Sequence, residues 1–437
     1  MRIPGRLGLT LIRFEAKNFR SIAAPVTLSL VAIDQDREAA RPAERLGESL
    51  LTRAAIYGPN ASGKSNLLVA LIWLRDAVTD SLHAWDDQIP VDPFAFGEGG
   101  ETTTEFVLDL LVGGVRFEYV LGLDAERVHY EALHHYPERR RRTLFEREAE
   151  ELSLHRTLGS PAGTRELLTP TSLAVTILSR LRVDPVQSFV DCLASFEAAG
   201  MERVVRRTLA PGRYLRALFD DAMPGPDPRI AAHERARQRE QARSLLRMAD
   251  LGIRDVAVVD VRNPMLDLRS MTEALLYGPE QADRAVQLIH DDGGTGRPLP
   301  FHEESAGTQT WYSAIGTVLP ALHSGSPVVF DELDASLHPT LAAHLLRIFA
   351  DPAINPKGAQ LIFSSHDTSL LAHLNRDEVW LTEKRKDGST RLGALSDFAG
   401  ERVRSSVKLE SAYLHGKFGA LPDVDQAEFL RSLGLIG

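Results

Sequence analysis

One loop limits the possible folds of this chain more than any other segment: Gly58, Pro59, Asn60, Ala61, Ser62, Gly63, Lys64 and Ser65. It matches the pattern G-x-x-x-x-G-K-[ST], in which a glycine-containing loop joins a buried strand to a helix. The context agrees, because the run Ser49–Tyr57 ends in apolar residues and an apolar helical pattern, Ser65–Asp80, follows the loop. The alternative is a chance glycine loop between a strand and a helix.

The residue types of this loop suit a chain of phosphates. Glycines let backbone N–H groups turn toward phosphate oxygens, and the N-terminus of the following helix favours the same anion. We expect Lys64 to reach the β- and γ-phosphates, Ser65 to bind Mg²⁺, and Asn66 to lie at the same site. ATP and Mg²⁺ are therefore the expected cofactors.

A second segment supplies carboxylates. The apolar strand Pro327–Phe330 ends in Asp331 and Glu332. Asp331 suits Mg²⁺, which binds a few carboxylates and keeps several waters. Glu332 is placed to polarise an attacking water, since phosphoryl transfer needs an oriented nucleophile more than covalent chemistry. Alone, the Asp-Glu pair could equally be a surface turn.

Further polar residues surround this pair in the chain. Ser305 and Gly307 open a helix before it, and they predict a second anion site; the alternative for Ser305 is a plain helix N-cap. Asp334 follows the pair directly. His366 ends the next strand, where it could contact the γ-phosphate or be a structural histidine.

In order and spacing, these motifs resemble an ABC-type ATPase, with Walker A, signature, Walker B, D-loop and H-loop. The resemblance implies that Ser305 and Gly307 cap the γ-phosphate held by the P-loop of another copy, with Asp334 crossing the same interface. It also implies a homodimer or higher homo-oligomer when ATP is bound. The signature Glu304–Gln309 departs from the transporter form LSGGQ.

The start Phe14–Ser21 (FEAKNFRS) resembles the N-terminal strand of RecF, SMC and related DNA-associated ATPases. The runs Leu246–Ile253, Glu303–Thr308 and Tyr413–Pro422 are similar to a narrower group, the "AAA family" ATPases of bacterial phage-defence operons of the RloA and PARIS AriA type. That resemblance implies a separately encoded effector, often a nuclease, that the ATPase holds or releases. The residues after His366 lack the acidic pattern of a TOPRIM nuclease.

Three functions therefore stay open. The first is an ATPase that controls an effector in antiviral defence, the second a RecF-like DNA-repair ATPase, and the third a slow nucleotide-gated scaffold. A transporter cassette fits worst, because the chain between Lys64 and Ser305 is too long for it.

The expected fold class is α/β: an ABC-type P-loop head with mixed β-sheet lobes and a helical insertion. The 437 residues allow two or three units. We expect an N-terminal lobe with Walker A at 1–136, an arginine-rich and mainly helical insertion at 137–251, and a C-terminal lobe at 252–437. Gln88 is a candidate for the Q-loop glutamine, the alternative being an exposed loop residue.

Composition bounds the partners. The net charge of −10 argues against a uniformly basic nucleic-acid binder. Nucleic acid stays possible through the arginine-rich insertion, in which Arg139–Arg142 and the arginines from Arg229 to Arg247 could equally form a solvated surface. With a single cysteine, Cys192, and neither a secretory signal nor a membrane span in the sequence, we expect a cytoplasmic protein without membrane contact.

Overall fold

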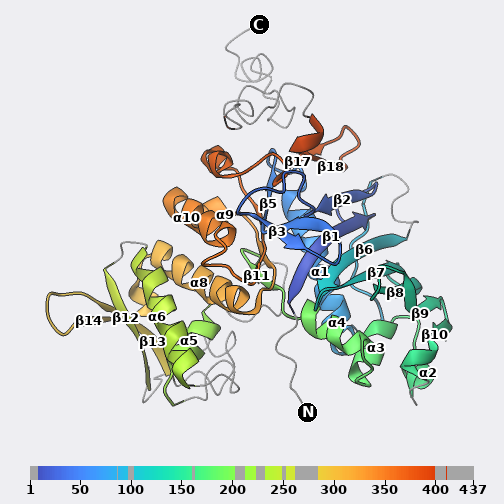
Figure 1. Ribbon diagram of the computed structural model, residues 1–437, viewed down its shortest axis with the longest axis horizontal. Helices are drawn as coiled ribbons and strands as arrows, with labels where there is room; N and C mark the ends of the chain where they lie inside the picture. The colour runs from blue at the N-terminus through green and yellow to red at the C-terminus, as the bar shows by residue number, and fades with distance from the viewer. Residues whose placement is uncertain are drawn as a thin grey trace, which may run out of the picture.

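The computed structural model describes residues 8–85, 87–96, 103–159, 163–201, 212–222, 232–248, 252–260, 284–398 and 410. The run Tyr413–Pro422 and Arg229 lie outside these ranges, as does part of Leu246–Ile253. The described chain forms a mixed α/β structure with several sheets, which confirms the expected class (Figure 1).

A seven-stranded antiparallel sheet occupies one flank of the molecule in Figure 1. Its turn at Gly113-Gly114 has positive φ at both residues, as a two-residue hairpin requires. Along the sheet the strands are β10 (Glu151–Leu154), β9 (Arg142–Glu148), β8 (Val128–Tyr136), β7 (Val115–Leu123), β6 (Thr104–Val112), β1 (Leu9–Lys17) and β2 (Val26–Ser29).

A six-stranded, mainly parallel sheet carries the P-loop. Both of its faces are covered, because alternate residues belong to different cores: Ala54 and Ile56 join one apolar cluster, Ala55 and Tyr57 the other. In order the strands are β11 (Glu197–Ala199), β15 (Val328–Phe330), β16 (Leu361–Ser364), β5 (Arg53–Tyr57), β17 (Val379–Lys384) and β18 (Thr390–Ala394).

Helices cover the two faces of this sheet. One face packs on α1 (Lys64–Ala84), whose other neighbours include α3 (Ala174–Arg180) and α4 (Val186–Leu193). The other face packs on α8 (Ala306–Ser324), α9 (Leu333–Ser336) and α10 (Pro339–Ala350). The short helices α2 (Thr164–Leu167), η2 (Arg156–Leu158), η4 (Phe301–Glu303) and η6 (Leu395–Phe398) and the ribbon of β3 (Ala40–Ala43) with β4 (Glu48–Leu51) complete these parts.

A smaller lobe lies on the opposite flank from the seven-stranded sheet (Figure 1). It combines a three-stranded antiparallel sheet with two helices that pack on α8. Its elements are α5 (Arg213–Phe219), α6 (Ala232–Met248), β12 (Ile253–Asp260), β13 (Arg284–His290) and β14 (Arg297–Pro300). Its apolar residues share one cluster with α8 and α10, so the lobe has a common core with the helix that begins after Ser305.

Several local expectations differ from the structure. The segment 137–251 is not helical from its start, because β9 and β10 first extend the seven-stranded sheet. Thr368–His373 forms the 3₁₀ helix η5. β18 was not expected at all; it pairs with β17 along five residue pairs, Trp380–Lys384 with Thr390–Ala394.

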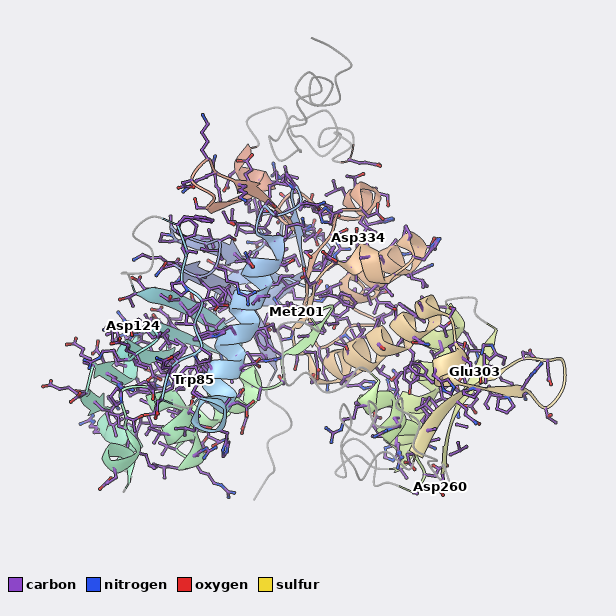
Figure 2. The ribbon with its side chains drawn as sticks, turned by 180° about the vertical axis from the view of Figure 1, so that it is seen from behind. Trp85, Asp124, Met201, Asp260, Glu303 and Asp334 are labelled. Atoms are coloured by element: carbon purple, nitrogen blue, oxygen red, sulfur yellow. The ribbon has the colours of Figure 1, made fainter. Side chains whose placement is uncertain are left out.

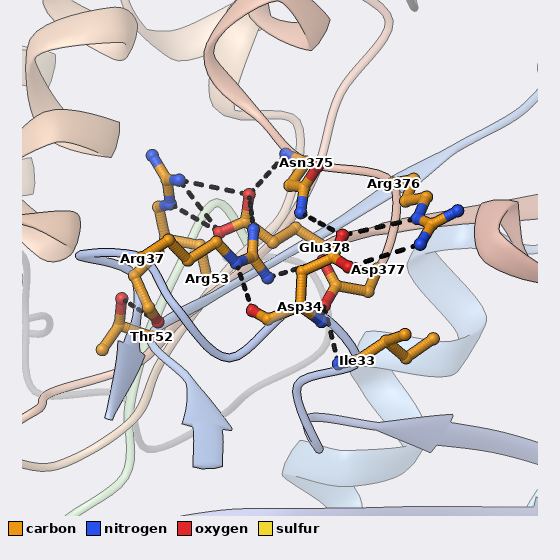
Figure 3. A network of polar contacts seen from close by, with 10 residues as sticks. Ile33, Asp34, Arg37, Thr52, Arg53, Asn375, Arg376, Asp377 and Glu378 are labelled. Carbon is orange, nitrogen blue, oxygen red and sulfur yellow. Dashed lines mark hydrogen bonds and ion pairs between the residues drawn. The ribbon is translucent and has the colours of Figure 1, made fainter. Parts of the chain in front are cut away.

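Buried charges fix the start of the P-loop strand. Arg53, the first residue of β5, donates to Glu378 Oε1 from Nε at 3.0 Å and from Nη2 at 2.9 Å. Arg37 contacts Glu378 at 3.2 Å and Asp377 at 2.5 Å (Figure 3). Since Arg53 and Glu378 are both buried, the pair compensates charges that would otherwise be costly to bury.

Candidate functional site

The P-loop has the left-handed backbone that its glycines permit. φ is 153° at Gly58 and 103° at Gly63, which is also the N-cap of α1. A side chain at Gly58 would collide with Thr382, and one at Gly63 would collide with Thr390. Both glycines are therefore required by close packing as well as by conformation.

Lys64 lies across this loop. Its Nζ donates to the carbonyl oxygens of Gly58 at 2.9 Å and Pro59 at 3.1 Å. Burial lowers the pKa of Lys64, while the nearby Asp331, Glu332 and Asp334 raise it. A bound phosphate chain would take the place of these carbonyls as the partner of the buried ammonium group.

Asp331 meets Ser65 at the carboxyl end of the sheet. Ser65 Oγ donates to Asp331 Oδ1 at 3.1 Å, although the two residues lie on different strand–loop units. A serine hydroxyl next to a carboxylate provides the hard oxygen ligands that Mg²⁺ prefers, so these two residues fit the expected ion. The structure thus brings together the two predicted metal residues.

Ser364, the last residue of β16, was missed by the sequence reasoning. Its hydroxyl donates to Asp331 Oδ1 and accepts a hydrogen bond from the N–H of Glu332 at 2.8 Å. Ser364 is fully buried, whereas Glu332 is exposed at the start of α9. One hydroxyl therefore links the predicted metal carboxylate to the backbone of the predicted base.

Asp334 and His366 are also brought together. The Asp334 carboxylate accepts the backbone N–H of His366 at 3.1 and 3.2 Å. The His366 residue is exposed at this edge of the sheet. The carboxylate thereby fixes the main chain from which the imidazole projects.

Ser305 lies elsewhere on the same chain. It is exposed, as are Ala306 and Gly307, and it caps α8 by accepting the N–H of Thr308 at 3.1 Å. Figure 2 shows Glu303, two residues earlier, on the flank of the smaller lobe and away from Asp334. Ser305 is thus the N-cap of α8, and its helix end is exposed on the surface of the chain.

The segment before α8 is held by side chains. Gln309 Nε2 donates to the carbonyls of Phe301 at 3.1 Å and Glu304 at 3.0 Å. The buried Glu304 contacts His290 Nε2 at 2.6 Å, which ties this segment to β13. The position of Ser305 therefore depends on the smaller lobe.

Gln88 is an exposed residue in the loop that follows α1. A different segment, the end of β11, lies against Asp331: Ala199 O accepts the N–H of Asp331 at 3.0 Å. A side chain at Gly200 would collide with Asp331 O. Only three residues form β11, so no periodic pattern marks it in the sequence.

Most described arginines of α6 have structural partners. Arg235 donates to carbonyls at the C-terminal end of α5, including Leu218 O at 3.1 Å. Arg239 does the same at 2.7 Å, and Arg243 pairs with Asp255 at 2.7 Å. In the earlier arginine run, Arg139 donates to Arg45 O at 2.7 Å. Arg235, Arg239 and Arg243 thus bond within the smaller lobe, which neither the nucleic-acid alternative nor the solvated-surface alternative had anticipated.

Comparison with known proteins agrees with this geometry. A sequence profile of the family described as "AAA domain, putative AbiEii toxin, Type IV TA system" matches residues 53–372. One curated protein, the phosphoenolpyruvate guanylyltransferase of Conexibacter woesei, is 35% identical over 109 residues, which are 25% of this chain and 47% of that protein. The chain thus spans about half the length of this relative, and the match carries no assignment.

Similar solved structures are heads of SMC proteins. An SmcHead bound to the C-winged helix domain of ScpA has a TM-score of 0.45 and 11% identity, covering 88% of this chain and 97% of that chain. The SMC head domain from Thermotoga maritima gives 0.37 and 14%, with 88% and 98% covered. A Pyrococcus furiosus Smc head bound to the C-terminal domain of ScpA gives 0.41 and 11%, with 89% and 97% covered.

Within the described residues, no helix combines the length and apolarity of a membrane span.

Proposed function

Since the chain belongs to the AAA-domain family whose profile covers residues 53–372, we propose that it is an ABC-type ATPase that hydrolyses ATP between two head-to-tail copies. The observation that carries this proposal is the contact of Ser65 with Asp331 at 3.1 Å. It joins the glycine loop and the acidic strand end in one site, as nucleotide hydrolysis requires.

Each residue has a role in this proposal. Residues Gly58–Ser65 and Asn66 hold the triphosphate, with Lys64 on the β- and γ-phosphates. Ser65 and Asp331 hold Mg²⁺, which would neutralise developing phosphate charge. Glu332 orients the attacking water, and His366 contacts the γ-phosphate.

The second half of the site comes from the other copy. Ser305 and Gly307 are exposed at the N-terminus of a 19-residue helix, where backbone N–H groups favour an anion. Glu303, two residues before Ser305, lies away from Asp334 in Figure 2, which supports a triphosphate that reaches both features only between two molecules. Asp334 would lie at the same interface.

We further propose that the dimer controls a separately encoded effector in bacterial antiphage defence, in the cytoplasm. The family description, which names a toxin of a toxin–antitoxin system, supports this biological setting. The smaller lobe supports a route for control, because His290 on β13 contacts Glu304 in the segment that carries Ser305.

Mass in solution tests the dimer. The variant Glu332→Gln should bind ATP, fail to hydrolyse it and double its mass when ATP and Mg²⁺ are added. The double variant Glu332→Gln/Ser305→Arg should bind ATP as a monomer, because only the trans contact is blocked. An ATP-loaded Glu332→Gln protein that stays monomeric at all concentrations would rule out the head-to-tail arrangement.

A further inference from the structure

A chain of hydroxyl groups joins the P-loop to two segments far away in sequence. Ser62 Oγ lies 2.6 Å from Thr382 Oγ1 on β17, and Thr382 Oγ1 donates to Tyr57 O at 3.1 Å. Thr390 Oγ1 on β18 donates to Ser62 O at 2.9 Å. The P-loop is thus bonded to both strands of the β17–β18 hairpin.

The same chain continues to the turn between β1 and β2. Ser21 Oγ lies 2.7 Å from Thr390 Oγ1, and Asn66 Nδ2 donates to Ser21 Oγ at 2.7 Å. The backbone N–H of Thr390 also donates to Ser21 O at 2.7 Å. Ser21 is the last residue of the N-F-R-S element, which ends the run Phe14–Ser21 that resembles the N-terminal strand of RecF and SMC proteins.

Counting hydrogens fixes the direction of each bond. A hydroxyl has one hydrogen, and Thr382 and Thr390 give theirs to the carbonyls of Tyr57 and Ser62. Ser62 must therefore donate to Thr382, and Ser21 must donate to Thr390. The four hydroxyls are then satisfied in one sense only, and none of them has a hydrogen to spare for an alternative arrangement.

The network touches the P-loop before, within and after its glycines, at Tyr57, Ser62 and Asn66. Ser62, Thr382 and Thr390 are 1%, 0% and 3% exposed, so water cannot replace a lost partner. The hairpin threonines also occupy the space that side chains at Gly58 and Gly63 would fill.

We infer that Ser21, Thr382 and Thr390 are positioning residues that hold the P-loop in its phosphate-binding shape before the nucleotide arrives. This inference rests on the proposed function. A preformed loop spends no binding energy on ordering itself, so its loss weakens triphosphate binding. The N-F-R-S turn thereby acts on the nucleotide through Ser21 and Thr390.

The test measures the dissociation constant for ATP with Mg²⁺ by calorimetric titration of the full chain. Thr390→Val keeps the shape of the side chain and removes the hydroxyl, and it should raise the constant roughly tenfold, equal to about 1.4 kcal/mol. Thr390→Ser, which keeps the hydroxyl, should restore most of the affinity. Ser21→Ala combined with Thr390→Val should cost less than the sum of the two, because they share one bond.

Thr176→Val is the matched control. Thr176 is 2% exposed and donates to Val78 O at 2.9 Å on α1, as Thr390 does to Ser62 O. It should lower thermal stability about as much as Thr390→Val and leave ATP affinity unchanged.

Two results would overturn the inference without affecting the proposed function. They are unchanged ATP affinity in Thr390→Val, or a loss of affinity in Thr176→Val equal to that in Thr390→Val. Failure of Thr390→Ser to recover binding would also contradict it, because the hydroxyl alone would then not hold the loop. Absence of ATP binding by the unaltered chain would instead overturn the proposed function itself.

Discussion

Glu332 has a backbone conformation that is unusual for its residue type. Its φ is 51° and its ψ is 58°, in the left-handed region that residues other than glycine rarely adopt. Such a conformation persists when neighbouring contacts over-determine it, and here the N–H of Glu332 is held by the buried Ser364. The orientation of the proposed base is therefore set from β16.

Replacing Glu332 by glutamine removes the proposed base and keeps its size. We expect ATP turnover to fall by about 100-fold or more, since general-base catalysis contributes 10²–10⁴. ATP affinity should stay within about twofold. Steady-state turnover and equilibrium binding measure the two effects separately, and unchanged turnover would remove Glu332 from this role.

Replacing Ser364 by alanine should separate the metal carboxylate from the base. Asp331 keeps its contact with Ser65, but the N–H of Glu332 loses its acceptor. The variant also removes the hydrogen bond that the hydroxyl donates to Asp331. We expect turnover to fall at least about tenfold, since each buried hydrogen bond left unmade costs about 1–3 kcal/mol, and the Mg²⁺ concentration for half-maximal activity to rise.

Ser365→Ala is the control for that variant. Ser365 is equally buried, and its hydroxyl accepts the N–H of Asp367 at 2.9 Å instead of contacting Asp331 or Glu332. A similar shift of the Mg²⁺ dependence in both variants would contradict a specific role for Ser364.

The sequence indicates the residues of each motif but not the residues that connect the motifs. Lys64, Ser65 and Asp331 stand in short patterns whose chemistry is local. Ser364 and Thr390 carry no such pattern, because their function is a contact across the fold; Ser21 and Thr390 are 369 positions apart.

At the scale of elements, α3 begins without a cap of its own. Its N-cap is Leu173, which offers no side-chain acceptor. The buried Glu131 on β8 accepts the N–H groups of Ala174 at 2.7 Å and Val175 at 2.8 Å, and the Tyr119 hydroxyl at 3.0 Å. The helix is therefore capped by the sheet on which it packs.

Glu131→Gln should destabilise the fold by about 1–3 kcal/mol, because an amide group would face a backbone N–H donor. Burial raises the pKa of Glu131 above its ordinary 4.5, opposed by the bonds from Val175 and Ala174. The folded state thus binds this proton more tightly, so the free energy of unfolding falls as pH rises from below 4.5 through the raised pKa.

Denaturant titrations across this pH range measure the effect as the difference between the two proteins. Glu131→Gln should lack the part of the pH dependence of the unfolding free energy that comes from Glu131. Glu146→Gln is the control, because Glu146 accepts the Tyr130 hydroxyl at 2.8 Å in the same sheet but caps no helix. Parallel pH profiles for the unaltered chain and Glu131→Gln would contradict the assignment.

The elements that the sequence predicted least well are those with weak periodicity. β10 is the edge strand of its sheet and β9 is its neighbour. Both carry charged residues, so their sequence resembles that of a solvated surface. α6 was expected correctly as a helix, but whether Arg235 and Arg239 face water or α5 depends on packing that periodicity alone does not determine.

At the scale of the molecule, the proposed dimer completes each site from the P-loop of one copy and the exposed start of α8 of the other. Lys64→Ala lacks one half and Ser305→Arg the other, so each should be inactive alone. A mixture contains heterodimers in which one of the two composite sites has an intact P-loop and an intact signature. ATPase activity should therefore be recovered on mixing.

The recovered rate should follow the fraction of heterodimers as the mixing ratio is varied, with a maximum at equal amounts. Mixing Lys64→Ala with Glu332→Gln is the control, because neither copy then offers both an intact P-loop and an intact base. Activity in Ser305→Arg alone at the level of the unaltered chain would show that Ser305 does not act in trans.

The buried pair of Arg53 and Glu378 (Figure 3) lies at the other end of β5 from the P-loop. If β5 slid by one residue along β17, the buried Arg53 would separate from Glu378 and lose the carboxylate that compensates its charge in the core. The pair thus fixes the register of β5 against β17. This register determines how far the phosphate-binding turn protrudes beyond the sheet edge. An allele that loses one of these charges should be tolerated only with a second change at the other position.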